Sequence, residues 1–205
     1  MRYKKVVFFL LSLLLLGLTA CSTQIKDVAV PLVEVPKKQE SAKRQLQNIK
    51  EAIANNKLRH ADDLYLSLRG AYSEANEVAD AILLLSQAHI DAEEYLLSKY
   101  YADSYITEYP NGRRLDKAAF LRVKSVFFQF KSNQTDPTLQ KQMHGDSKVF
   151  LKHFSKSQYV PKVKRMYTEF KKILFTKNEE IAKAYEKMGK VKAAKYYRDK
   201  NRLKN

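Results

Sequence analysis

The residue with the clearest chemistry in this 205-residue chain is its only cysteine, Cys21. A cysteine thiolate is a nucleophile, and in an exported protein a lone cysteine has no intramolecular disulfide partner. A leucine and two small residues, Leu18, Thr19 and Ala20, stand directly before it. We therefore expect the thiol of Cys21 to be covalently modified.

The residues before Cys21 follow the order of a secretory signal. Three basic residues open the chain: Arg2, Lys4 and Lys5. Residues 6–16 are then almost unbroken hydrocarbon, too short to span a bilayer comfortably, and small residues follow. The sequence thus predicts that residues 1–20 are a signal peptide, removed from the mature protein.

Leu18 to Cys21 resembles the bacterial lipobox. In that family of signals the cysteine thiol receives a diacylglycerol, the preceding peptide is cut, and the new amino terminus is acylated. More than one acyl chain gives lasting membrane attachment. Ser22, which is not an aspartate, implies by the same resemblance sorting to the outer membrane. The alternative is an ordinary signal peptide followed by an incidental cysteine.

The charge of the chain is strongly positive, at +16. Removal of residues 1–20 takes away three basic residues and no acid, so the mature chain keeps +13. Such a charge attracts polyanions, including anionic lipid and acidic protein surfaces. A signal peptide makes nucleic acid an unsuitable partner. Basic and acidic residues also alternate along the chain, as on a solvated helix surface.

Residues that could carry catalysis or bind a metal form no recognisable constellation. The four histidines have no metal-ligand spacing, and no nucleophile elbow or phosphate-binding loop occurs. We interpret the adjacent acids at 62–63 and 93–94 as solvated surface charges, and His89, on an apolar stripe, as a core residue. We therefore expect no enzymatic activity, no cofactor and no metal. An enzyme with a site assembled from dispersed residues is the minority alternative.

The composition predicts an all-α fold. Five glycines and five prolines are too few for the turns of a β-sandwich, and residues that favour helices dominate. Pro31 and Pro36 disfavour a helix, so we expect residues 21–40 to comprise the lipidated cysteine and a flexible tether. Residues 41–205 form the helical domain, with Ser41 as a helix N-cap and a turn at residues 55–56.

Helical periodicity predicts roughly nine helices. The later ones cover residues 78–95, 95–109, 116–130, a segment marked by Val149, Phe150 and Phe154, and residues 160–175, 178–188 and 191–203. The last pair carries a pattern of small and aromatic residues that resembles the tetratricopeptide repeat (TPR). Its repeat-packing residues are Ala182, Tyr185, Gly189 and Ala194. The alanines allow close helix approach, the tyrosine fills the space between the helices, and the glycine permits the turn. A weaker copy contains Ser86, His89, Ser98 and Pro110.

The order of lipobox, proline-containing tether and TPR-like helices resembles the BamD (ComL) family of lipoproteins. The resemblance is closest at residues 146–159, with their Ser-Gln-Tyr ending, and at residues 178–201. It implies an antiparallel helix-hairpin solenoid at the periplasmic face of the outer membrane. It further implies a non-enzymatic scaffold for the assembly and insertion of outer-membrane β-barrels. The chain has room for about four and a half repeats, whereas the family generally has five.

The resemblance also implies partners. These are the periplasmic domains of the barrel-forming BamA subunit, other subunits of the assembly complex, and unfolded barrel substrates. Our candidate partner-binding residues are basic: Lys162, Lys164, Arg165, Lys171 and Lys172. Charges of this kind mainly steer association. The alternative function is another TPR-type envelope lipoprotein that binds peptidoglycan or anionic envelope components and supports envelope integrity.

Overall fold

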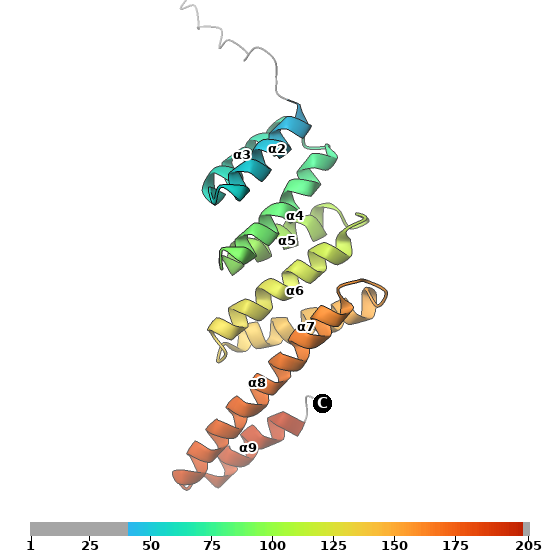
Figure 1. Ribbon diagram of the computed structural model, residues 1–205. Helices are drawn as coiled ribbons and strands as arrows, with labels where there is room; N and C mark the ends of the chain where they lie inside the picture. Colours follow the sequence, from blue (N-terminus) through green and yellow to red (C-terminus); the bar gives the residue numbers. More distant parts are fainter. Residues whose placement is uncertain (1–40, 203–205) are drawn as a thin grey trace, which may run out of the picture. The chain divides into compact units, whose positions relative to one another are not determined.

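The computed structural model describes residues 41–202, which are helical with no strand. Its helices are α2 (Ala42–Ala54), α3 (Leu58–Ala71), α4 (Asn76–Asp91), α5 (Tyr95–Glu108), α6 (Leu115–Ser132), α7 (Pro137–His153), α8 (Val160–Lys187) and α9 (Val191–Arg202). Consecutive helices pair, and each pair packs on the next (Figure 1). The predicted all-α, TPR-like fold is confirmed. The predicted signal peptide, Cys21 and tether lie outside the described residues.

The first helix begins as expected, because the Ser41 hydroxyl accepts a hydrogen bond from the amide of Arg44. The prediction of two helices over residues 160–175 and 178–188 is wrong. These residues form one continuous 28-residue helix, α8. No glycine or proline occurs between Lys162 and Met188, so nothing interrupts the helical hydrogen bonds. Within residues 41–202 the chain therefore has eight helices rather than nine.

The turns inside three of the four pairs are built alike. One residue in each has positive φ: Asn56 at 56°, Glu93 at 62° and Gly189 at 72°. The next amide donates to the carbonyl five residues back: Lys57 to Ala52 at 2.9 Å, Glu94 to His89 at 2.8 Å, and Lys190 to Tyr185 at 2.9 Å. This is the Schellman ending of a helix. The recurrence of one turn identifies three copies of one structural unit.

Buried residues at matching places hold each pair together. Two buried residues flank each positive-φ position, one seven residues before it and one five residues after it. They are Ile49 and Ala61, Ser86 and Ser98, and Ala182 and Ala194. All six are at most 1% exposed. Five of the six are alanine or serine, whose small side chains allow the two helices to approach closely, and Ile49 is the exception. The pair α6–α7 differs, because a longer loop joins its helices and Asp136 caps α7 by accepting from the amides of Thr138 and Leu139.

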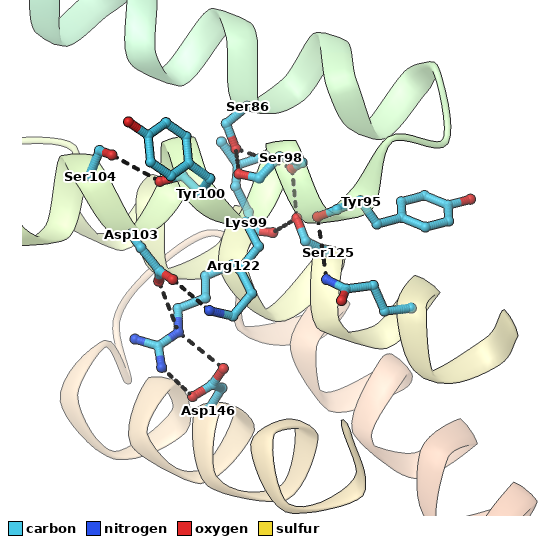
Figure 2. A network of polar contacts seen from close by, with 12 residues as sticks. Ser86, Tyr95, Ser98, Lys99, Tyr100, Asp103, Ser104, Arg122, Ser125 and Asp146 are labelled. Carbon is cyan, nitrogen blue, oxygen red and sulfur yellow. Dashed lines mark hydrogen bonds and ion pairs between the residues drawn. The ribbon is translucent and has the colours of Figure 1, made fainter. Parts of the chain in front are cut away.

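Serine hydroxyls link the second pair to the third (Figure 2). Ser86 Oγ lies 3.0 Å from the carbonyl oxygen of Ser98 and donates to it. The hydroxyls of Ser98 and Ser125 are 2.6 Å apart, and Ser125 Oγ donates to the carbonyl of Leu121 at 2.8 Å. All three serines are fully buried. The chain of hydrogen bonds satisfies them and joins α4, α5 and α6.

His89 is a buried core residue, as predicted, with polar partners on both sides. Its Nδ1 lies 2.6 Å from Glu94 Oε2 and its Nε2 3.0 Å from Asp62 Oδ1. The Tyr101 hydroxyl donates to the same Asp62 oxygen at 2.7 Å, and its ring stacks on the imidazole at 5.4 Å. The interpretation of Asp62 as a solvated charge is therefore wrong. Its carboxylate faces inward and joins α3, α4 and α5.

The two halves of α8 have different neighbours. Near its beginning, Phe170 packs edge-on against Phe130 of α6, with ring centroids 4.8 Å apart. Near its end, Tyr185 stacks on Tyr197 of α9 at 5.7 Å. Within the described residues, α8 is the only helix against which α9 packs closely. One helix thus belongs to the body of the stack and to the terminal pair.

Candidate binding groove

A cavity of about 370 Å³ opens between α4, α6 and α8, the first helices of their pairs. Its lining residues are Gln87 of α4, Lys117, Phe120, Leu121, Lys124, Phe127 and Phe128 of α6, and Tyr159, Lys162, Arg165 and Met166 at the start of α8. We call this site the basic groove. It combines apolar walls with a few charged groups, as ligand-binding sites generally do.

The charged groups of the basic groove are all cations. Lys117 and Lys124 come from α6, whereas Lys162 and Arg165 come from α8, and no acidic side chain contributes to the lining. Burial lowers the pKa of Lys117, and the neighbouring positive charge of Arg114 lowers it further. Four like charges in one concave site repel one another and attract a negatively charged ligand.

An aromatic pair forms one wall of the groove. The rings of Phe120 and Tyr159 stack with centroids 4.4 Å apart and planes 7° from parallel. Lys162 Nζ lies 5.8 Å from the centroid of Phe120 and 6.0 Å from that of Tyr159. Contact with the ring faces holds this cation in place without an acidic partner. Its charge therefore remains available to a ligand.

The link between α7 and α8 is fastened to α6 by one carboxylate. Ser157 Oγ donates to Asp116 Oδ2 at 2.7 Å, and the amide of Tyr159 donates to Ser157 Oγ at 3.2 Å. The other oxygen of Asp116 accepts from the amide of Lys117 at 2.7 Å. These bonds place Tyr159 beside Phe120. The Ser-Gln-Tyr ending that carried the family resemblance thus positions a wall of the groove.

The five basic residues predicted for partner binding do not form one site. Lys162 and Arg165 line the basic groove. Lys171 is nine residues from Lys162, which places it on the opposite flank of α8, where its Nζ lies 5.4 Å from the Tyr167 ring. Two others, Lys164 and Lys172, are exposed and line none of the cavities.

The predicted repeat-packing residues lie together in the terminal pair. Ala182 and Ala194 are buried, at 0% and 1% exposed. Tyr185 stacks on α9, and Gly189 has the positive φ of the Schellman turn. Cys21 lies outside the described residues.

A second cavity, of about 420 Å³, lies among α5, α6 and α7 and is mostly apolar. Arg122 and Asp146 are its charged residues, and they pair with each other at 2.9 Å (Figure 2). Burial raises the pKa of Asp146, and Arg122 opposes this shift. Because its two charges neutralise each other, this cavity offers an ionic ligand less than the basic groove does.

Sequence reasoning missed the α6 side of the basic groove. Lys117 and Lys124 are seven residues apart, two turns of helix, and therefore share a face. Phe120 and Phe127 have the same spacing and follow that face. This alternation of basic and aromatic residues was the available signal. That α8 lies beside it is a tertiary fact that local periodicity does not contain.

Comparison with known proteins shows to which protein family this chain belongs. Residues 37–204 match the model of the YfiO family, described as an outer membrane lipoprotein. The chain is also similar to "Outer membrane protein assembly factor BamD" of Helicobacter pylori, with 28% identity over 199 residues that cover 96% of this chain and 86% of the relative. No helix in the described range is both long and apolar enough to cross a bilayer. The family match spans the whole described domain, and this chain belongs to the YfiO family of outer membrane lipoproteins.

Proposed function

We propose that this protein is a non-enzymatic scaffold in the assembly and insertion of β-barrel outer-membrane proteins. The relative that supports this function is an outer membrane protein assembly factor, and the alignment runs over nearly the whole chain. The structural observation that carries the proposal is the basic groove, where four cations and an aromatic pair face an open site without acidic residues. A cluster of basic side chains is one of the recurring means by which proteins recognise an acidic segment of a partner.

We infer that the groove takes an acidic segment of the periplasmic region of a BamA-like barrel-forming subunit. Lys162 and Arg165 belong to the carboxy-terminal part of the chain, to which the family resemblance assigns this contact. Their charges would steer association, while Phe120 and Tyr159 would supply apolar contact. The amino-terminal pairs would engage unfolded barrel substrates.

The remaining proposals concern the segment before the described domain. We propose that residues 1–20 are removed as a signal peptide and that Cys21 carries the acyl chains. Residues 22–40 then tether the helical domain to the outer membrane, at its periplasmic face. Membership of an outer membrane lipoprotein family supports this assignment.

The test is a charge reversal at the groove with a control on the same helix. Lys162→Glu combined with Arg165→Glu should weaken binding of the barrel-forming subunit by about 2–4 kcal/mol, because like charges then face each other across the contact. The subunit should therefore be lost from co-purification. Lys164→Glu combined with Lys172→Glu makes the same change in net charge at exposed sites outside the groove. Barrel content of the outer membrane should fall only with the first pair.

Equal effects of the two pairs would show that net charge matters and that the groove does not. Depletion of the whole protein provides the broader test, since many unrelated barrels should decrease together. Normal barrel levels after depletion, with retention of the protein on purified peptidoglycan, would favour the envelope-structural function instead.

A further inference from the structure

The charge of the described domain is concentrated at one end of the sequence. Residues 41–136 carry 13 basic and 13 acidic side chains, and their net charge is zero. Residues 137–202 carry 18 basic and 6 acidic side chains, a net charge of +12. The basic groove draws only Lys162 and Arg165 from this region. Most of the positive charge therefore lies outside the basic groove.

The turn between α8 and α9 is the part of that region where charge and exposed apolar side chains coincide. Met188 is 63% exposed and Val191 is 69% exposed. Four lysines surround them in the sequence: Lys187, Lys190, Lys192 and Lys195. All four are exposed, and none forms an ion pair with any residue between 41 and 202. The nearby Glu186 is engaged by Arg198 at 2.9 Å. We call residues 187–192 together with Lys195 the basic tip.

The folding of the turn does not explain these apolar residues. The same Schellman turn joins α2 to α3 and α4 to α5. The residue equivalent to Met188 is Asn55 in one and Ala92 in the other, and the α4–α5 turn carries two acids, Glu93 and Glu94. The geometry requires only a residue that tolerates positive φ. Exposed methionine and valine among unpaired lysines are therefore a property of this tip alone among the three turns.

We propose that the basic tip binds the surface of an anionic lipid bilayer, with Met188 and Val191 entering the interfacial region and the four lysines contacting acidic headgroups. Apolar side chains rimmed by lysine are the pattern of interfacial membrane contact. Each lysine near an anionic surface strengthens binding about fivefold. A stable protein contact requires about 800 Å² on each partner, and two side chains on a protruding turn do not provide it.

The tip is separate from the basic groove. Lys162 and Met188 are 26 positions apart along one helix, or roughly 39 Å. Lipid binding at the tip therefore does not use the residues proposed to hold the assembly partner. It can be tested in vesicles that contain no other protein.

The chain contains no tryptophan, so a single introduced indole reports from one place. Met188→Trp would be made in the full chain, purified from membranes and reconstituted into vesicles. Brominated phosphatidylglycerol should quench its fluorescence and shift the emission to shorter wavelength, whereas vesicles of brominated phosphatidylcholine alone should not. The matched control is Ala92→Trp, which occupies the same position of the same turn beside acids. Its emission should not change in either kind of vesicle.

Two further variants keep the proposal falsifiable. Val191→Trp is a second reporter, should Met188→Trp disturb the turn. Replacing the four lysines by glutamine in the Met188→Trp chain should abolish quenching at low salt. In the Met188→Trp chain that keeps its lysines, about 1 M salt should also abolish quenching, because the Debye length then falls to about 3 Å. If both reporters behave like Ala92→Trp in anionic vesicles, the proposal is overturned. If they respond only when the barrel-forming subunit is added, the tip is a protein contact and the bilayer assignment is wrong.

Discussion

Replacing Asp62 by alanine should destabilise the domain, whereas the same change at the adjacent Asp63 should have little effect. The two acids are neighbours on α3 with the same chemistry, but the structure places them differently. Asp62 accepts hydrogen bonds from Tyr101 and faces His89. Asp63 is exposed, and only its main-chain oxygen accepts a bond, from Ser67. The pair is therefore a matched test of one inward carboxylate.

The size of the effect follows from the groups that lose their acceptor. Without the carboxylate, the Tyr101 hydroxyl and the His89 Nε2 would lie unpaired in side chains that are 5% and 1% exposed. Each unsatisfied buried polar group costs about 1–3 kcal/mol. The Asp62 side chain is itself 26% exposed, so water can reach part of the vacated space. We therefore expect a loss of about 2–4 kcal/mol in the free energy of unfolding for Asp62→Ala, and less than about 0.5 kcal/mol for Asp63→Ala.

Thermal unfolding followed by circular dichroism measures the difference. At about 2–4 °C per kcal/mol for a domain of this size, Asp62→Ala should lower Tm by roughly 4–16 °C, and Asp63→Ala by no more than about 2 °C. Adding Tyr101→Phe to Asp62→Ala removes one of the unpaired donors, so the second change should cost less there than in the parent protein. Equal melting temperatures for the two alanine variants would refute the reasoning.

Three further expectations concern other parts of the chain. Cys21→Ala should release the protein from membranes, and mass spectrometry of the mature amino terminus should find an acylated cysteine; an unmodified thiol would contradict this. Ala194→Trp should overpack the buried contact of α8 with α9 and cost about 1–3 kcal/mol in urea unfolding, while the exposed Ala184→Trp should not. Burial raises the pKa of Tyr65 and Tyr101, so both release their protons more readily in the unfolded chain than in the folded one. Stability should therefore fall as the pH rises beyond about 10, the usual pKa of tyrosine, and a flat profile from pH 9 to 11 would exclude it.

The helices and their pairing could be predicted because their signals are local. Ser41 at a helix start and the apolar stripes every three to four residues follow from geometry within one helix. Gly189 likewise indicated the turn between the last two helices. The turn at residues 55–56 was predicted as well, whereas the equivalent turn at Glu93 has no such signal, because an acidic residue has positive φ there.

The predictions that were wrong concern features that depend on contacts between residues far apart in the sequence, or on the absence of a helix-breaking residue. Asp62 finds Tyr101 39 positions later in the chain, and no local pattern distinguishes it from Asp63. The prediction of two helices placed a break between residues 175 and 178, but Asn178 bonds Asn201 of α9 through its side chain while its backbone stays helical. The predicted lysines on α8 were grouped by proximity in sequence, whereas the helix distributes them around its circumference.

The unbroken length of α8 has a mechanical consequence. A helix of 28 residues is roughly 42 Å long. Its first turns form a wall of the basic groove and its last turn forms the basic tip, so the two sites are the ends of one strut. A tilt of about 10° about one end displaces the other by roughly 7 Å. A ligand that grips one end of the strut therefore sets the direction of the other, and no residue between them has to change its conformation.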